Sequence, residues 1–184
     1  MLEDKKSSEN KNIIEILPKN RFNNVKIFGI IPFIFSIIKK NSMINIFYEI
    51  ENFRIKNEFS FINEINILLN NEGYIINNNI NYIFCNDDFI LGMNKKYLNK
   101  DYYTDVIAFS YSTENLKFSI LGDIYISIDR IIENSKKWNE FFLVELKRVM
   151  IHGVLHLIGY NDKKKEDKKL MKKKENFYLD LFQF

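Results

Sequence analysis

Apolar and polar positions alternate in a way that predicts interleaved strands and helices from about residue 43 onward. Short runs rich in Ile, Phe and Tyr are typical of strands. Longer segments repeat apolar residues every three or four positions, as helices with one buried face do. The predicted strands are 44–50, 80–85, 104–111 and 118–127, and the predicted helices are 60–71, 86–97, 127–132, 141–158 and 164–182. This interleaving indicates a single domain of the α/β or α+β class.

Two of these helices have recognisable starts. Asn86-Asp87-Asp88 supplies an N-cap for the helix that follows it, and Ser127 or Asp129 does so for the next helix. For the last helix, the 3.6-residue period predicts one apolar face. That predicted face consists of Leu170, Met171, Phe177, Tyr178 and Leu181.

The first 42 residues differ in character from the rest of the chain. Residues 1–27 are polar and rich in Lys and Asn, and residues 28–38 form an apolar run. A bilayer-spanning helix needs about 20 apolar residues, so this run is too short. Lys39-Lys40-Asn41 follows where a signal peptide would have a small-residue cleavage site. We therefore expect 1–42 to be a poorly ordered N-terminal extension, with Met43 as an alternative start of translation, and no membrane association.

Composition narrows the class of protein. The chain has 184 residues, of which 46% are apolar and 15% aromatic, as in a globular domain. A formal net charge of +3 permits an anionic partner without specifying one. Cys85 is the single cysteine, so the chain makes no internal disulfide and a reducing compartment is expected. Cys85 lies in the apolar run 82–85, which favours a buried residue over a reactive thiol.

The strongest chemical signal is the segment His152-Gly153-Val154-Leu155-His156, which contains both histidines of the chain. Positions four apart lie on the same face of a helix, one turn from each other. Two imidazoles placed in this way can bind one Zn²⁺ ion. The alternative is a pair of core or surface histidines with ordinary hydrogen bonds, but the surrounding helix is apolar, where unpaired imidazoles are costly to bury.

A third ligand follows the histidines. Gly159 is a natural helix stop, and Asp162 then supplies a carboxylate beyond the turn. Two imidazoles and one carboxylate leave a fourth position open, as in catalytic rather than structural zinc sites. Gly153 stands where the zinc-peptidase pattern H-E-x-x-H has its glutamate base. A peptidase is therefore disfavoured, although the spacing of the metal ligands is the same as in the zinc peptidases.

The same segment resembles a known family. Residues 152–162 resemble the H-G-x-L-H-L-x-G-Y-D-H signature of the YbeY family, the rRNA-maturation endoribonucleases. Three further matches occur in the expected order along residues 43–184. Tyr97 and residues 104–109 resemble the family segment Y-R…T-D-V-L-S-F, and residues 122–124 match its G-D-I strand. Met171 and Glu175 fit its M-x-x-x-E spacing.

The resemblance implies an α+β single domain with a mixed four-stranded sheet packed with helices and a zincin-like metal-binding helix. It implies a single-strand-specific, metal-dependent endoribonuclease that acts in 16S rRNA 3′-end maturation and ribosome quality control in the cytoplasm. One Zn²⁺ per chain would be held by His152, His156 and Asp162. The implied partners are single-stranded RNA, pre-16S rRNA and small-subunit ribosomal proteins.

Two positions depart from the family pattern. Asp162 stands where the family usually has a third histidine, which preserves metal binding but alters affinity or metal preference. Leu98 replaces the arginine that would handle phosphate, and Lys96 or Lys100 is a candidate substitute. Aromatic residues near the site are candidates for stacking bases or for packing against the sheet: Tyr102, Tyr103 and Tyr111. Asp105 and Asp123 are expected to be structural carboxylates rather than to act next to the metal ligands.

Two other functions remain open from the sequence. The first is a non-catalytic ribosome-assembly factor with a structural zinc ion, which the replacement of arginine by Leu98 favours. The second is a zinc peptidase or another hydrolase, against which the missing glutamate argues.

Overall fold

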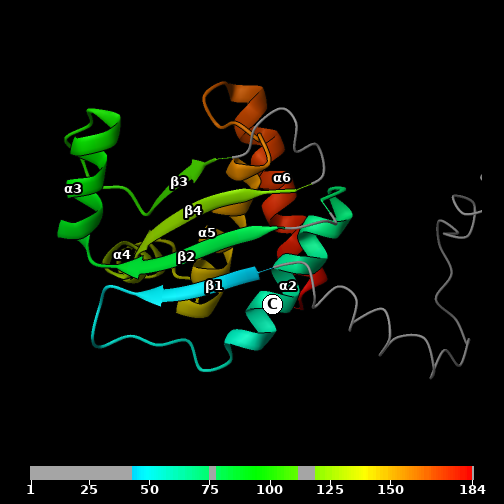
Figure 1. The fold of residues 1–184 in the computed structure, drawn as a ribbon, viewed down its shortest axis with the longest axis horizontal. Coiled ribbons are helices and arrows are strands. Elements are labelled where there is room, and N and C mark those ends of the chain that lie inside the picture. Colours follow the sequence, from blue (N-terminus) through cyan, green and yellow to red (C-terminus); the bar gives the residue numbers. More distant parts are fainter. Residues whose placement is uncertain (1–42, 75–77, 112–118, 184) are drawn as a thin grey trace, which may run out of the picture. The chain divides into compact units, whose positions relative to one another are not determined.

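The computed structural model describes residues 43–74, 78–111 and 119–183, so the expected N-terminal extension 1–42 lies outside the described residues. In the described part the chain order matches the predicted interleaving (Figure 1). The elements are β1 (Met43–Tyr48), α2 (Glu58–Asn71), β2 (Asn79–Cys85), α3 (Asp87–Leu98), β3 (Val106–Ser110), β4 (Leu121–Ser127), α4 (Ile128–Trp138), α5 (Phe142–Leu157) and α6 (Lys165–Leu181). No helix within these described ranges is both long and apolar enough to cross a bilayer.

The four strands form one mixed sheet in the order β1-β2-β4-β3. The first three strands are parallel, with Ile80 opposite Ile44 on one side and opposite Gly122 on the other. Strand β3 runs antiparallel to β4, with Ala108 opposite Ile124. The α+β class and the mixed four-stranded sheet are therefore confirmed. Figure 1 shows β2 and β4 at the centre of the sheet and β1 and β3 at its edges.

One face of the sheet carries the main core. Alternate residues of β2 and β4 point to this face and are buried, as the two-residue period of a strand requires. Helices α2, α5 and α6 contribute the opposing side chains of the same cluster. The fully buried members of this core include Tyr82, Phe84, Ile124, Ile126, Leu68, Leu69, Leu146, Val154 and Leu155. Helix α5 thus lies directly against the sheet, and its position fixes both histidines.

The other face of the sheet carries a smaller cluster in which Cys85, Ile90 and Ile107 are buried. Cys85 has no exposed surface, so its predicted burial is confirmed. Burial, followed by the charges of nearby carboxylates, raises the pKa of the Cys85 thiol to about 12. The thiol is therefore protonated and unreactive in the folded protein.

The predicted helix starts are confirmed, but the predicted face of the last helix is partly wrong. Asn86 Oδ1 accepts a hydrogen bond from the Phe89 N–H at 2.9 Å, and Ser127 Oγ accepts one from the Arg130 N–H at 3.2 Å. In α6, Met171 and Tyr178 are buried as expected. The predicted face members Leu170, Phe177 and Leu181 are instead exposed, whereas Glu175 and Leu179 are buried. The buried face of α6 therefore includes Glu175, whose carboxylate bonds to His152 of α5.

Candidate metal centre

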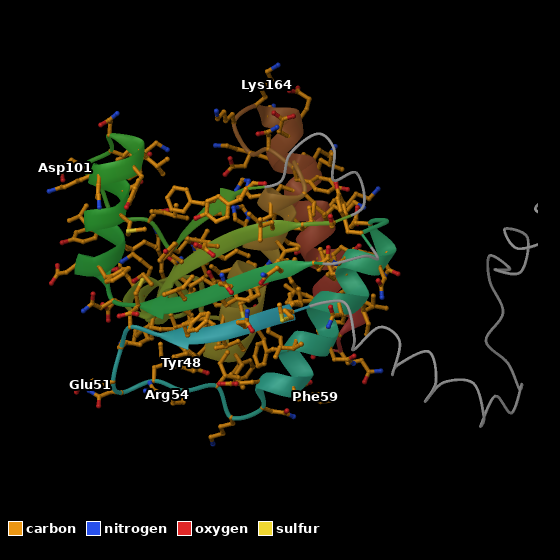
Figure 2. All side chains as sticks on the ribbon, in the orientation of Figure 1. Tyr48, Glu51, Arg54, Phe59, Asp101 and Lys164 are labelled. Carbon is orange, nitrogen blue, oxygen red and sulfur yellow. The ribbon has the colours of Figure 1, made fainter. Side chains whose placement is uncertain are left out.

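The end of α5 and the turn after it bring the three predicted ligands to one place. Both histidines lie in the last two turns of α5. Gly159 has a φ of +98°, a conformation that glycine adopts without strain. Its N–H donates to the His156 carbonyl at 3.0 Å, and the Tyr160 N–H donates to the Leu155 carbonyl at 2.9 Å, so the chain reverses in a Schellman-like turn. The loop that carries Asp162 then leads to Lys164, the residue before α6, which is labelled in Figure 2.

The three side chains converge as the sequence predicts. One ligand atom from each of His152, His156 and Asp162 lies within 4.8 Å of the others. The two Nε2 atoms are 2.8 Å apart, and His156 Nε2 is 4.0 Å from Asp162 Oδ2. Bonds of about 2.0–2.2 Å to zinc place two ligand atoms at most about 4.4 Å apart. The distances of 2.8 and 4.0 Å between these ligand atoms are therefore close to those of a metal site. The Asp162 side chain is 47% exposed and has room to close the remaining distance.

Both imidazoles are held by their Nδ1 atoms, which leaves Nε2 as the free end. His152 Nδ1 donates to Glu175 Oε1 at 2.7 Å. His156 Nδ1 donates to the Tyr160 carbonyl at 2.9 Å. A carbonyl oxygen only accepts hydrogen bonds, so the proton of neutral His156 is on Nδ1 and its Nε2 lone pair faces His152. This is the arrangement of metal-binding histidines, in which the second nitrogen bonds to a carboxylate or a backbone carbonyl.

The facing lone pairs explain why the pair suits a cation. With both Nδ1 atoms protonated, two Nε2 lone pairs oppose each other at 2.8 Å, which is repulsive unless a proton or a metal ion lies between them. Burial acts to lower the pKa of His152. The hydrogen bond and charge of Glu175, together with the charges of Asp105 and Asp162, raise this pKa by more, so the net shift is upward. Burial and the neighbouring charge of His152 lower the pKa of His156. His156 is thus kept neutral, and the surroundings of the pair are negative.

A network of charged side chains extends from His152 through its partner Glu175. Glu175 is 11% exposed and lies 3.8 Å from Arg148, whose Nε is 3.4 Å from Glu145. Glu145 is 1% exposed, and burial is the main cause of the raised pKa of its carboxyl group. Asn134 Nδ2 donates to both Asp105 and Glu145 at 3.4 and 3.5 Å. Asp105 therefore belongs to the network that supports His152, and its negative charge contributes to the raised pKa of that histidine, whereas the sequence predicts a purely structural carboxylate.

Gly153, which follows the first histidine, faces the sheet. A Cβ atom at this position would lie 2.6 Å from Ile124 Cγ2 and 3.4 Å from Val106 Cγ2. Real Cβ atoms essentially never approach another atom within 3.0 Å, so a side chain at this position requires Ile124 or its surroundings to shift. The glutamate of the zinc-peptidase pattern therefore has no room in this packing, which argues against the peptidase alternative.

The other predicted site residues are more dispersed. Asp123 is in the middle of β4, where its carboxylate accepts hydrogen bonds from Asn81 Nδ2 at 2.8 Å and Tyr111 Oη at 2.9 Å. Tyr102 and Tyr103 are about half exposed, and Arg130 lies over the Tyr103 ring at 5.3 Å. These contacts give Asp123 a structural role and leave the stacking of bases on the tyrosines as a prediction.

The end of α3 contains the position of the missing arginine. Leu98 is the last residue of α3 and is 39% exposed. Lys96 Nζ lies 4.8 Å from the centre of the Tyr97 ring, and Lys100 Nζ lies 5.7 Å from that of Tyr102. Both lysines are exposed beside aromatic rings, so their substitution for the arginine remains a prediction.

The sequence does not identify two residues that support the centre, Tyr160 and Glu72. The carbonyl of Tyr160 accepts the hydrogen bond that fixes His156. Its hydroxyl donates to Glu72 at 2.8 Å, across 88 positions of sequence. No local sequence pattern predicts a contact over this separation. The position of Tyr160 directly after the helix-stop glycine is the one sequence feature that draws attention to this residue.

Comparison with known proteins gives consistent matches over the described domain. The family model described as Endoribonuclease YbeY matches residues 44–183. Endoribonuclease YbeY of Karelsulcia muelleri is 50% identical over 137 residues, which are 74% of this chain and 94% of the relative. The protein of the same description from Flavobacterium psychrophilum is 49% identical over 144 residues, covering 76% and 96% of the two chains. A solution structure from Thermotoga maritima matches with a TM-score of 0.56 and 28% identity, covering 76% of this chain and 89% of that one.

Proposed function

This chain belongs to the Endoribonuclease YbeY family and is a hydrolase, and from that premise we propose that it cleaves single-stranded RNA with a zinc ion held by His152, His156 and Asp162. The observation that carries the metal assignment is the pair of Nε2 atoms facing each other at 2.8 Å while both Nδ1 atoms are engaged elsewhere. We assign one zinc ion to each chain. The substrate, pre-16S rRNA at its 3′ end, rests on the family resemblance, as do ribosome quality control, a cytoplasmic location and contact with small-subunit ribosomal proteins.

The donor set fits zinc. Imidazole nitrogens and a carboxylate oxygen are ordinary zinc ligands, and three protein ligands are typical of catalytic rather than structural zinc sites. When bound, zinc supplies a Lewis acid for a phosphoryl oxygen and lowers the pKa of a bound water to about 7.

The residues of the chain hold this site in a fixed geometry. Glu175 fixes the ring of His152, and the Tyr160 carbonyl fixes that of His156. Asp162 approaches from a loop and remains 47% exposed, so the site opens to solvent on the side of this loop. An exposed side is required for a polymer substrate, because a single strand of RNA must reach the metal without unfolding the domain.

The replacement of the family arginine by Leu98 favours one second candidate, a non-catalytic assembly factor with a structural zinc ion. The half-exposed carboxylate ligand weighs against it, because structural zinc sites are closed with four protein ligands. Rescue of rRNA processing in cells by a catalytically inactive His152→Ala chain would support the assembly factor. Failure of that variant to rescue, with its fold and its binding to the small subunit intact, would support the nuclease.

The deciding experiment measures metal content and RNA cleavage on the full chain and on His156→Ala. We expect close to one equivalent of zinc in the wild-type protein and cleavage of a single-stranded RNA, with both lost in the variant. Far-ultraviolet circular dichroism should be unchanged, since His156 is partly exposed at the end of α5. Equal RNA degradation by the two proteins, purified in parallel, would identify a contaminating nuclease and contradict the proposal.

A further inference from the structure

Glu72 is a nearly buried carboxylate on which three distant donors converge. It follows directly after α2 as the C-cap residue, and its side chain is 11% exposed. Its carboxylate accepts hydrogen bonds from Tyr160 Oη at 2.8 Å, Lys174 Nζ at 2.7 Å and Tyr178 Oη at 2.5 Å. Two of these donors belong to α6 and the third to the turn after α5. One side chain therefore ties three separate parts of the fold together.

Tyr160 is the donor that connects Glu72 to the metal centre. At its backbone, the Tyr160 carbonyl accepts the Nδ1 proton of His156, and its N–H donates to the end of α5. At its ring, the hydroxyl is bonded to Glu72, and Lys174 Nζ lies 5.4 Å from the ring centre. Asp162 is only two positions further along. The side-chain bond to Glu72 thus holds the segment that orients one ligand and carries another.

We propose that Glu72 is a positioning residue that holds the Tyr160–Asp162 turn in the geometry required for metal binding. This inference rests on the proposed zinc site. Glu72 does not touch the ligands themselves, and its effect passes through Tyr160 to the ring of His156 and to the position of Asp162. Partners that orient metal ligands contribute to metal affinity even though they lie outside the coordination sphere.

The ionised carboxylate suits this task. Burial acts to raise the pKa of Glu72, but the hydrogen bonds from Lys174, Tyr178 and Tyr160 outweigh burial, so its pKa is lowered. A charged carboxylate has enough lone pairs to accept all three donors, and charge-assisted hydrogen bonds are the stronger kind. A glutamine would keep one oxygen acceptor and lose the charge that attracts Lys174.

Two tyrosines offer a matched test, because each donates one phenolic hydroxyl to the same carboxylate. Tyr160→Phe removes the bond that holds the turn carrying Asp162, and Tyr178→Phe removes a bond to the same carboxylate that does not involve this turn. Zinc affinity is measured on the full-length chain by competition with a chromophoric chelator, and stability by urea unfolding of the metal-free protein. We expect Tyr160→Phe to weaken zinc binding by about 10-fold and Tyr178→Phe to leave it within about twofold, although both lower stability.

The carboxylate itself is tested by Glu72→Ala and Glu72→Gln. We expect zinc affinity to fall by about 10- to 100-fold in the alanine variant and by less in the glutamine variant, which keeps an acceptor for the Tyr160 hydroxyl. Equal zinc affinities in Tyr160→Phe and Tyr178→Phe, or wild-type affinity in Glu72→Ala, would overturn the inference. A wild-type chain that takes up no zinc would instead contradict the proposed function itself, so the two failures are distinguishable.

Discussion

The Nδ1 atom of His152 lies 2.7 Å from Oε1 of Glu175, 23 positions further along the chain. This bond joins α5 to α6 and sets the ring of His152 so that Nε2 faces the ring of His156. Glu175 is among the few charged side chains that are buried in the described part of the chain. A buried carboxylate is costly to desolvate unless it is paired, so its position indicates a purpose beyond packing.

The first prediction concerns this carboxylate. Glu175→Ala should weaken zinc binding by about 10- to 100-fold, because the ring of His152 loses the partner that fixes its orientation and tautomer. Glu175→Gln keeps an acceptor at the same distance and should lose less. Chelator competition on both variants measures the effect, and identical affinities in the alanine variant and the wild type would contradict the orienting role.

The second prediction concerns Asp162. Asp162→Ala should lower zinc affinity, because one of the three proposed ligands is removed. Asp162→His restores the residue usual in the family and should shift preference from Mn²⁺ toward Zn²⁺, since imidazole suits zinc and carboxylate suits manganese. Competition titrations with the two metals measure this preference. If neither substitution changes zinc affinity, Asp162 is not a ligand.

The third prediction compares two glycines in helices. Gly153→Ala should destabilise the fold by about 1–3 kcal/mol, because the added methyl group meets Ile124 at 2.6 Å. Gly92→Ala in α3 is the matched control, since nothing lies within 4 Å of its added Cβ. Alanine is the better helix former, so the control should gain about 0.5–1 kcal/mol. Urea unfolding of metal-free protein measures both, and a neutral Gly153→Ala would show that Ile124 shifts at no cost to stability.

The fourth prediction concerns Cys85. The pKa of about 12 means that almost no thiolate exists in the folded state at pH 8. A thiol reagent such as dithionitrobenzoate should therefore react slowly with the native chain and release one equivalent rapidly in urea, where the thiol titrates near about pH 8.5. Raising the pH from 8 to 9 should accelerate the reaction in urea about threefold, because the thiolate fraction rises from about one quarter to about three quarters, whereas native labelling should stay far slower at both pH values. Fast native labelling would show that the cluster around Cys85 opens readily.

Much of the fold was predictable because its signals are local. The spacing of apolar residues located the elements of the described part of the chain, although the helix predicted over 127–132 extends to Trp138. Asn86 and Ser127 marked two helix starts through bonds to residues three positions away. The two histidines were predictable for the same reason, since one turn of helix separates them. Asp162 followed from the short turn at Gly159.

The rest depends on contacts between residues distant in sequence. The face of α6 was misjudged because Glu175 is buried for its bond to His152, whereas hydropathy alone predicts that a glutamate is exposed. Glu72 and Tyr160 are 88 positions apart, and their contact exists only once α2 and α5 are packed on the same face of the sheet. The order of the strands, with β4 between β2 and β3, likewise has no signature in the sequence.

The close approach of Gly153 to Ile124 also limits the chemistry that this centre could acquire by a single substitution. A glutamate at position 153 would not by itself supply the general base of a metallopeptidase, because its Cβ atom would already collide with the Ile124 side chain. The core between α5 and the sheet would have to repack before such a carboxylate could be accommodated.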